Sequence, residues 1–269
     1  MPEETKIAWT DSTFNMIWGC TKVSPGCTNC YALTLAHRYH ADLSLWGPTA
    51  DRLTFSDATW RKPLAWNRRA ERLGQRHKVF CSSLADNFED HPTVIAELPK
   101  LWALIRQTPY LDWQLLTKRS DRIALSLPHD WGHGYPNVWL GVSIENMDYA
   151  YRADDLRRIP AVVRFVSYEP ALGPLNMLRL HKLDWVIYGG ESGPGFRPEN
   201  PQWTRAMYRH CQEHGVAYFH KQESNILTER GTMIDGVSIQ EYPIPRALLT
   251  LHLTDQGPPD GNMQRADRH

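Results

Sequence analysis

The sequence predicts an α/β fold of the (βα) TIM-like barrel type with six or seven parallel strands. From about residue 78 onward, short apolar runs rich in β-branched and aromatic residues alternate with helical patterns. The runs are almost continuously apolar, which is typical of parallel strands with both faces buried. Polar residues follow the end of each run, where barrel enzymes carry their sites. A partial barrel is favoured, although periodicity alone leaves a closed barrel open.

Each predicted element is justified by its own pattern. Six apolar runs predict strands at 78–83, 113–118, 138–144, 163–168, 184–190 and 217–222. The segment 13–19 predicts a seventh strand, and the cysteine-containing loop that follows it leads into a helix at 30–40. Helical apolar spacing predicts further helices at 93–108, 147–159 and 201–215, the last of which ends at the C-cap glycine Gly215.

The predicted organisation is one barrel domain over residues 1–245 with a polar tail. Residues 41–77 form an insertion after the first helix, with Gly47-Pro48 and Pro63 as turn markers. Residues 246–269 are polar and predict a flexible C-terminal segment.

Charge and hydropathy indicate a cytoplasmic protein without membrane contact. Thirty basic and thirty acidic residues balance to zero, so the overall charge demands no polyanionic partner. The N-terminus lacks a basic segment followed by an apolar run, and no stretch reaches the roughly 18 apolar residues of a membrane span. The segment 60–78 carries seven Lys or Arg and one Glu. A solvated helix face is the favoured interpretation, while nucleic-acid contact aided by Trp60 and Trp66 stays open.

Three cysteines in the loop 19–31 predict a metal centre. Six residues separate Cys20 from Cys27, two separate Cys27 from Cys30, and Pro25-Gly26 lets the chain turn back. Converging thiolates suit zinc or an iron–sulfur cluster. A closed zinc site needs a fourth ligand, and no such residue lies at a customary spacing from the three cysteines. A cluster whose fourth iron position binds a small molecule is therefore favoured, with zinc as the alternative.

The predicted strand ends supply candidate catalytic and binding residues that share one face of the barrel. The candidates for catalysis are Lys118, Arg119, Glu145, Glu169 and Lys221. In the segment YGGESGPG the glycines would let backbone N–H groups approach a ligand, and Glu191 could bind an ammonium group or ribose hydroxyls. The candidates for cofactor binding are Gly189, Gly190, Glu191 and Ser192.

Six motifs carry a resemblance to a known family. They are GCTKVSPGCTNCYA, LTKR, NVWLGVSIEN, VRFVSYEPALGPL, LDWVIYGGESGPGFRP and HGVAYFHKQ. In order from about residue 5 to 245, they resemble the phage-associated three-cysteine family of uncharacterised barrel proteins. The family is more loosely similar to radical S-adenosylmethionine enzymes, which combine a partial barrel, a three-cysteine loop and often a Gly-Gly-Glu segment. This similarity implies a [4Fe–4S] cluster on Cys20, Cys27 and Cys30, and S-adenosylmethionine as a small-molecule cofactor.

Three functions follow as hypotheses. The leading one is a radical S-adenosylmethionine-like iron–sulfur enzyme, with a nucleotide or nucleic-acid substrate suggested by analogy alone. The second is a zinc-dependent hydrolase or nuclease, although three thiolates make zinc a poor Lewis acid. The third is a non-catalytic nucleic-acid-binding protein whose metal only fixes the N-terminal region.

Overall fold

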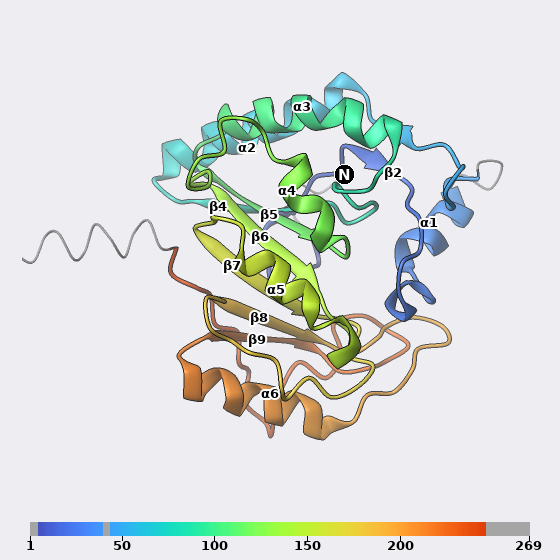
Figure 1. The fold of residues 1–269 in the computed structure, drawn as a ribbon, viewed down its shortest axis with the longest axis vertical. Helices are drawn as coiled ribbons and strands as arrows, with labels where there is room; N and C mark the ends of the chain where they lie inside the picture. The colour runs from blue at the N-terminus through green and yellow to red at the C-terminus, as the bar shows by residue number, and fades with distance from the viewer. Residues whose placement is uncertain (1–4, 40–43, 246–269) are drawn as a thin grey trace, which may run out of the picture.

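A curled sheet of seven parallel strands forms a half-barrel at the centre of the molecule (Figure 1). The computed structural model describes residues 5–39 and 44–245, so the predicted tail at 246–269 lies outside the described residues. The strands, in spatial order, are β1 (Ser12–Thr13), β4 (His77–Cys81), β5 (Leu111–Thr117), β6 (Val138–Ser143), β7 (Val163–Tyr168), β8 (Trp185–Gly189) and β9 (Ala217–Gln222). The six strands predicted between 78 and 222 are thereby confirmed, and so is the parallel α/β class.

Both faces of the sheet are buried, which explains the continuous apolar runs. Alternate strand residues such as Val79 and Leu115 join the large core beneath the helices. Their neighbours in sequence, among them Phe80, point to the inner face and pack with Trp9 and Trp185 in a second, aromatic-rich cluster. The alternation follows from the period of two along a strand.

The helices flank the sheet and connect its strands. Figure 1 shows α2 and α3 along one side of the sheet and α6 at the opposite end. The helices are α1 (Tyr31–Tyr39), α2 (Asp57–Leu73), α3 (Pro92–Arg106), α4 (Ile123–Ser126), α5 (Tyr151–Arg157) and α6 (Pro201–His214). Helix α6 ends at Gly215 with φ 63°, as predicted for a C-cap glycine. Among the described helices, none combines the length and apolar character that crossing a membrane requires.

The single strand predicted at 13–19 was wrong, because the chain divides there into two short strands. β1 joins the main sheet, whereas β2 (Ile17–Trp18) pairs antiparallel with β3 (Leu53–Thr54). Asn15 lies at the break. Its side-chain oxygen accepts a hydrogen bond of 2.8 Å from the backbone N–H of Leu84, so the chain is fixed to the segment after β4 instead of continuing along the sheet.

The predicted insertion at 41–77 also differs from the structure. It contains β3 and the 17-residue helix α2, which is the crossover between the parallel strands β1 and β4. Pro63 lies inside this helix and is buried, so it does not mark a turn. It belongs to a buried stripe with Trp60 and Trp66, whose helical spacing outweighs the proline signal. The Gly47-Pro48 turn is present, with φ 129° at Gly47.

One further helical prediction needs correction. The segment 147–159 is a 3-10 turn (Met147–Tyr149) followed by α5, which ends at Arg157. Between β7 and β8 all residues are described, and none of them forms a helix. The strand–helix alternation is thus interrupted once.

Candidate metal centre and its polar rim

The cysteine turn, residues 20–30, lies at the mouth of the half-barrel, where the carboxyl ends of the parallel strands meet. It follows β2, contains a 3-10 turn at Pro25–Cys27, and leads into α1, which Figure 1 shows on the side toward which the strand arrows point. Cys20, Cys27 and Cys30 are half-buried. Cys81 and Cys211 are fully buried and pack in the main core.

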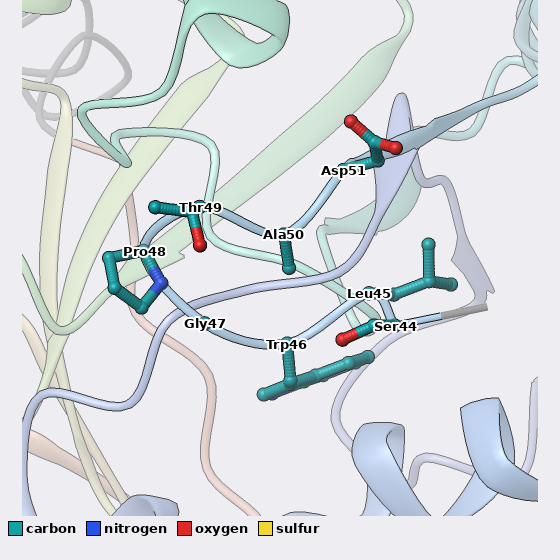
Figure 2. A pocket seen from close by; sticks show the side chains of 8 residues that line it. All are labelled: Ser44, Leu45, Trp46, Gly47, Pro48, Thr49, Ala50 and Asp51. Atoms are coloured by element: carbon teal, nitrogen blue, oxygen red, sulfur yellow. The ribbon is translucent and has the colours of Figure 1, made fainter.

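Cys20 is held by backbone hydrogen bonds to the loop that precedes β3. Its N–H donates to the carbonyl of Leu45 at 3.2 Å, and its carbonyl accepts from Gly47 at 3.1 Å. Figure 2 shows this loop, residues 44–51, lining a pocket beside the turn. Arg52 closes the loop because its guanidinium donates to the carbonyls of Leu45, Gly47 and Ala50.

An ion-pair network continues from Arg52 to Cys20. Glu89 accepts from Arg52 at 2.8 and 2.9 Å and pairs with Arg119 at 3.1 Å. Arg119 also pairs with Asp86 at 3.0 Å and donates to Sγ of Cys20 at 3.6 Å. Burial, followed by the charge of Asp86, raises the pKa of Cys20 to about 12, against the lowering effect of Arg119. Arg119 therefore contacts the cysteine turn directly.

Glu145 anchors the middle of the turn from the end of β6. Its fully buried carboxylate accepts from Ser24 Oγ at 2.6 Å and from Arg152 at 3.0 Å, and Lys118 Nζ lies 3.9 Å away. A Cβ at Gly26 would lie 2.7 Å from Cγ of Glu145, so the turn passes over this side chain too closely for any larger residue.

Glu191 anchors the far end of the turn from the end of β8. Its Oε2 accepts from the Asn29 side chain at 3.0 Å and from the backbone and Nε of Arg197 at 2.8 and 2.9 Å. Arg197 also donates to the carbonyl of Pro25 at 3.0 Å. Burial acts to raise the pKa of Glu191, but the hydrogen bonds from Arg197 and Asn29 lower it below its ordinary value. The carboxylate is therefore bonded to protein groups that fasten the turn.

Gly189 and Gly190 pair with the last residue of β9, and Ser192 pairs with the segment that follows it. Gly190 donates to the carbonyl of Gln222 at 2.9 Å, and Ser192 forms a bridge with Asn225. A Cβ at Gly190 would lie 2.6 Å from the carbonyl carbon of Glu223, so backbone contact requires a glycine there. The structure thus gives Gly190 a close protein neighbour, and its role toward a cofactor stays a prediction.

Glu169 and Lys221 form a separate ion pair of 2.5 Å across the mouth. The side chain of Glu169 lies over Gly189, where a Cβ would come within 2.8 Å of its carboxyl carbon. Both charged side chains keep some exposure, 23% for Glu169 and 12% for Lys221. The structure thus brings every predicted rim charge to one side of the sheet, but pairs each with an opposite charge.

Sequence reasoning missed several residues that hold the turn in place. These are Ser24, Asn29, Arg52, Glu89, Arg152 and Arg197. Arg197 follows the glycine-rich segment closely enough to be suspected from sequence. Arg52 and Glu89 gave no such signal, because an isolated charge in a loop is usually solvated.

The three thiols fit a thiolate-bound group in number and position, since one turn carries all three. Their sulfur atoms do not all lie within 4.8 Å of one another. A tetrahedral zinc ion with bonds of about 2.3 Å would bring its sulfur ligands to about 3.8 Å. An iron–sulfur cluster accepts wider spacing, because its thiolates bind different irons. The three thiols would therefore have to move closer together to bind a single zinc ion.

Fold and site together define the protein as an α/β half-barrel with a three-cysteine turn fastened at its mouth. The chain belongs to the family described as Protein of unknown function (DUF5131), whose match covers residues 4–243. A search of curated proteins finds no match, and a search of solved structures finds none either.

Proposed function

We propose that the chain is an iron–sulfur enzyme of the radical S-adenosylmethionine type, with Cys20, Cys27 and Cys30 as cluster ligands. The observation that carries the proposal is the single turn bearing three half-buried thiols at the mouth of a parallel half-barrel. Three thiolates would leave one position open and make zinc a poor Lewis acid, which supports a cluster over the zinc alternative. When bound, such a cluster supplies an electron for the reductive cleavage of S-adenosylmethionine.

Within this proposal the surrounding charges have two roles. Arg119, Glu145 and Glu191 position the turn, since each contacts a residue of it directly. Glu169 and Lys221 are the better candidates for contact with substrate or cofactor. Among the described residues, Lys221 is the one side chain that bonds Glu169, and both remain partly exposed. A ligand ammonium group could therefore bind the Glu169 carboxylate without breaking the bonds that hold the turn. Binding to Glu191 would compete with its bonds to Asn29 and Arg197.

The cluster is tested by anaerobic purification, iron and sulfide analysis and a visible absorption spectrum. We expect about four irons and four sulfides per chain and a broad visible band, all lost in Cys27→Ala. The matched control is Cys211→Ala, which removes a thiol in α6 and should keep the iron. A colourless anaerobic preparation without iron would contradict the proposal, and bound zinc that is lost in Cys27→Ala would support the hydrolase.

Cofactor binding is tested by equilibrium dialysis of S-adenosylmethionine against reconstituted protein. We expect Glu169→Gln to weaken binding at unchanged iron content. Glu191→Gln should act mainly through lower iron retention, because its carboxylate bonds the turn. Equal binding by the wild type and Glu169→Gln would assign the ammonium contact to another group.

A nucleic-acid substrate has one supporting observation, the exposed basic face of α2. Arg61, Lys62, Arg68 and Arg72 are solvent-exposed on this helix. Trp60 and Trp66, whose contribution the sequence left open, are not available for base stacking, because both are buried in the core. Any contact made by this face would be electrostatic.

A further inference from the structure

Helix α6 carries a cluster of potential metal ligands far along the chain from the cysteine turn. His210, Glu213 and His214 share one face of the helix, because residues three and four apart are neighbours on a helix surface. One ligand atom from each lies within 4.8 Å of the others, and the two imidazole rings have centroids 4.5 Å apart. His210 is half-buried, while Glu213 and His214 are exposed to solvent. An ion could therefore reach all three.

Hydrogen bonds fix which ring nitrogens are available. Nε2 of His210 lies 2.8 Å from the carbonyl of Leu178, and Nδ1 of His214 lies 2.9 Å from the carbonyl of His210. A carbonyl oxygen only accepts, so both of these nitrogens carry the proton. The lone pairs then belong to Nδ1 of His210 and Nε2 of His214. Metal-binding histidines typically have this arrangement, in which a carbonyl accepts from the nitrogen that does not bind the ion.

We propose that His210, Glu213 and His214 bind a divalent transition-metal ion of the zinc class, independently of the cysteine turn. Two imidazoles and one carboxylate suit such an ion, and water would complete its coordination. The ion would link the last two turns of α6. Because His210 also bonds the carbonyl of Leu178, it would fasten this end of the helix to the connection between β7 and β8.

Zinc titration calorimetry on untagged, full-length protein tests this site. Thiols would compete for zinc, so the parent is the triple variant Cys20→Ser/Cys27→Ser/Cys30→Ser. We expect one zinc per chain. His214→Ala in this background should weaken zinc binding at least about tenfold. Replacing a residue that only hydrogen-bonds a metal ligand already lowers the metal affinity by about that factor. Glu213→Gln should weaken it less, and His133→Ala, which removes an exposed imidazole elsewhere, should leave it unchanged.

A parent that fails to fold would shift the test to cysteine-intact protein, where equilibrium dialysis counts bound zinc. The wild type should then bind one zinc more than His214→Ala. An identical isotherm or an identical zinc count with and without His214 would overturn the assignment. Neither result depends on the identity of the cysteine-bound group, so this site and the proposed cluster can fail separately.

Discussion

The side-chain amide of Asn29 donates a hydrogen bond of 3.0 Å to Glu191, which joins residues 162 positions apart in the sequence. Asn29 directly precedes Cys30, and Glu191 directly follows the glycines at the end of β8. The contact ties the last cysteine of the turn to a strand far from β1. With the bonds from Ser24 to Glu145 and from Arg119 to Cys20, the turn is fastened at both ends and in the middle.

Replacing Glu191 by Gln should loosen this attachment. Glutamine keeps one acceptor but loses the charge that pairs with Arg197, and hydrogen bonds to charged groups contribute about 1.5–3 kcal/mol. We expect a loss of about 1–2 kcal/mol in the free energy of unfolding, measured with urea. The control is Glu71→Gln, an exposed acid on α2, which should change stability by less than about 0.5 kcal/mol. Equal losses in both variants would contradict the anchoring role.

Removing the Arg52 side chain should be more costly. Its guanidinium is fully buried, pairs with Glu89 and donates to four loop carbonyls. Arg52→Ala would leave Glu89 with one cationic partner, and breaking a buried pair costs about 3–5 kcal/mol. Urea unfolding should therefore show a large loss, whereas Arg61→Ala on the exposed face of α2 should be nearly neutral. A small loss for Arg52→Ala would mean that the network does not stabilise the loop.

Asp184 predicts a pH dependence of stability. Burial raises its pKa to about 7 in the folded chain, above the ordinary value of an unfolded aspartate. A raised pKa means that the folded state binds the proton more tightly, so this contribution is full below about pH 4 and is lost as the pH rises to about 7. Asp184→Asn should thus stabilise the protein more at pH 8 than at pH 5, by urea unfolding. A gain of the same size at both pH values would contradict the shift.

The basic face of α2 predicts a change in the salt dependence of nucleic-acid binding. Each phosphate contact contributes about −0.9 to the slope of log K against log salt for duplex DNA. If Arg61, Arg68 and Arg72 all contact phosphates, their replacement by Ala should weaken binding and reduce the slope by about 3. Fluorescence anisotropy measures both quantities. The control replaces three exposed arginines elsewhere, Arg38 on α1, Arg158 directly after α5 and Arg209 on α6. An equal effect there would rule out a specific surface.

Local patterns in the sequence were sufficient for most of the sheet and for the identity of the three-cysteine turn. A parallel strand buried on both faces must be apolar throughout, so β4 to β9 could be recognised without knowledge of their neighbours. Pro63 misled the prediction, since an interior proline removes a backbone hydrogen bond of the helix, and here the packing of the buried stripe with Trp60 and Trp66 outweighs that loss. Asn15 ended the first strand by bonding Leu84, a residue nearly 70 positions later.

The sequence by itself determined the α/β class, the succession of six strands along the chain and the presence of three thiols on one short loop. Tertiary structure decided how the charges at the strand ends are used. The sequence offers no way to rank the charged site candidates that follow a strand, among them Lys118, Arg119, Glu145 and Glu191. In the folded chain Arg119, Glu145 and Glu191 fasten the cysteine turn, whereas Glu169 pairs with Lys221 and stays partly exposed. These partners come from distant segments, and only folding brings them within hydrogen-bonding distance.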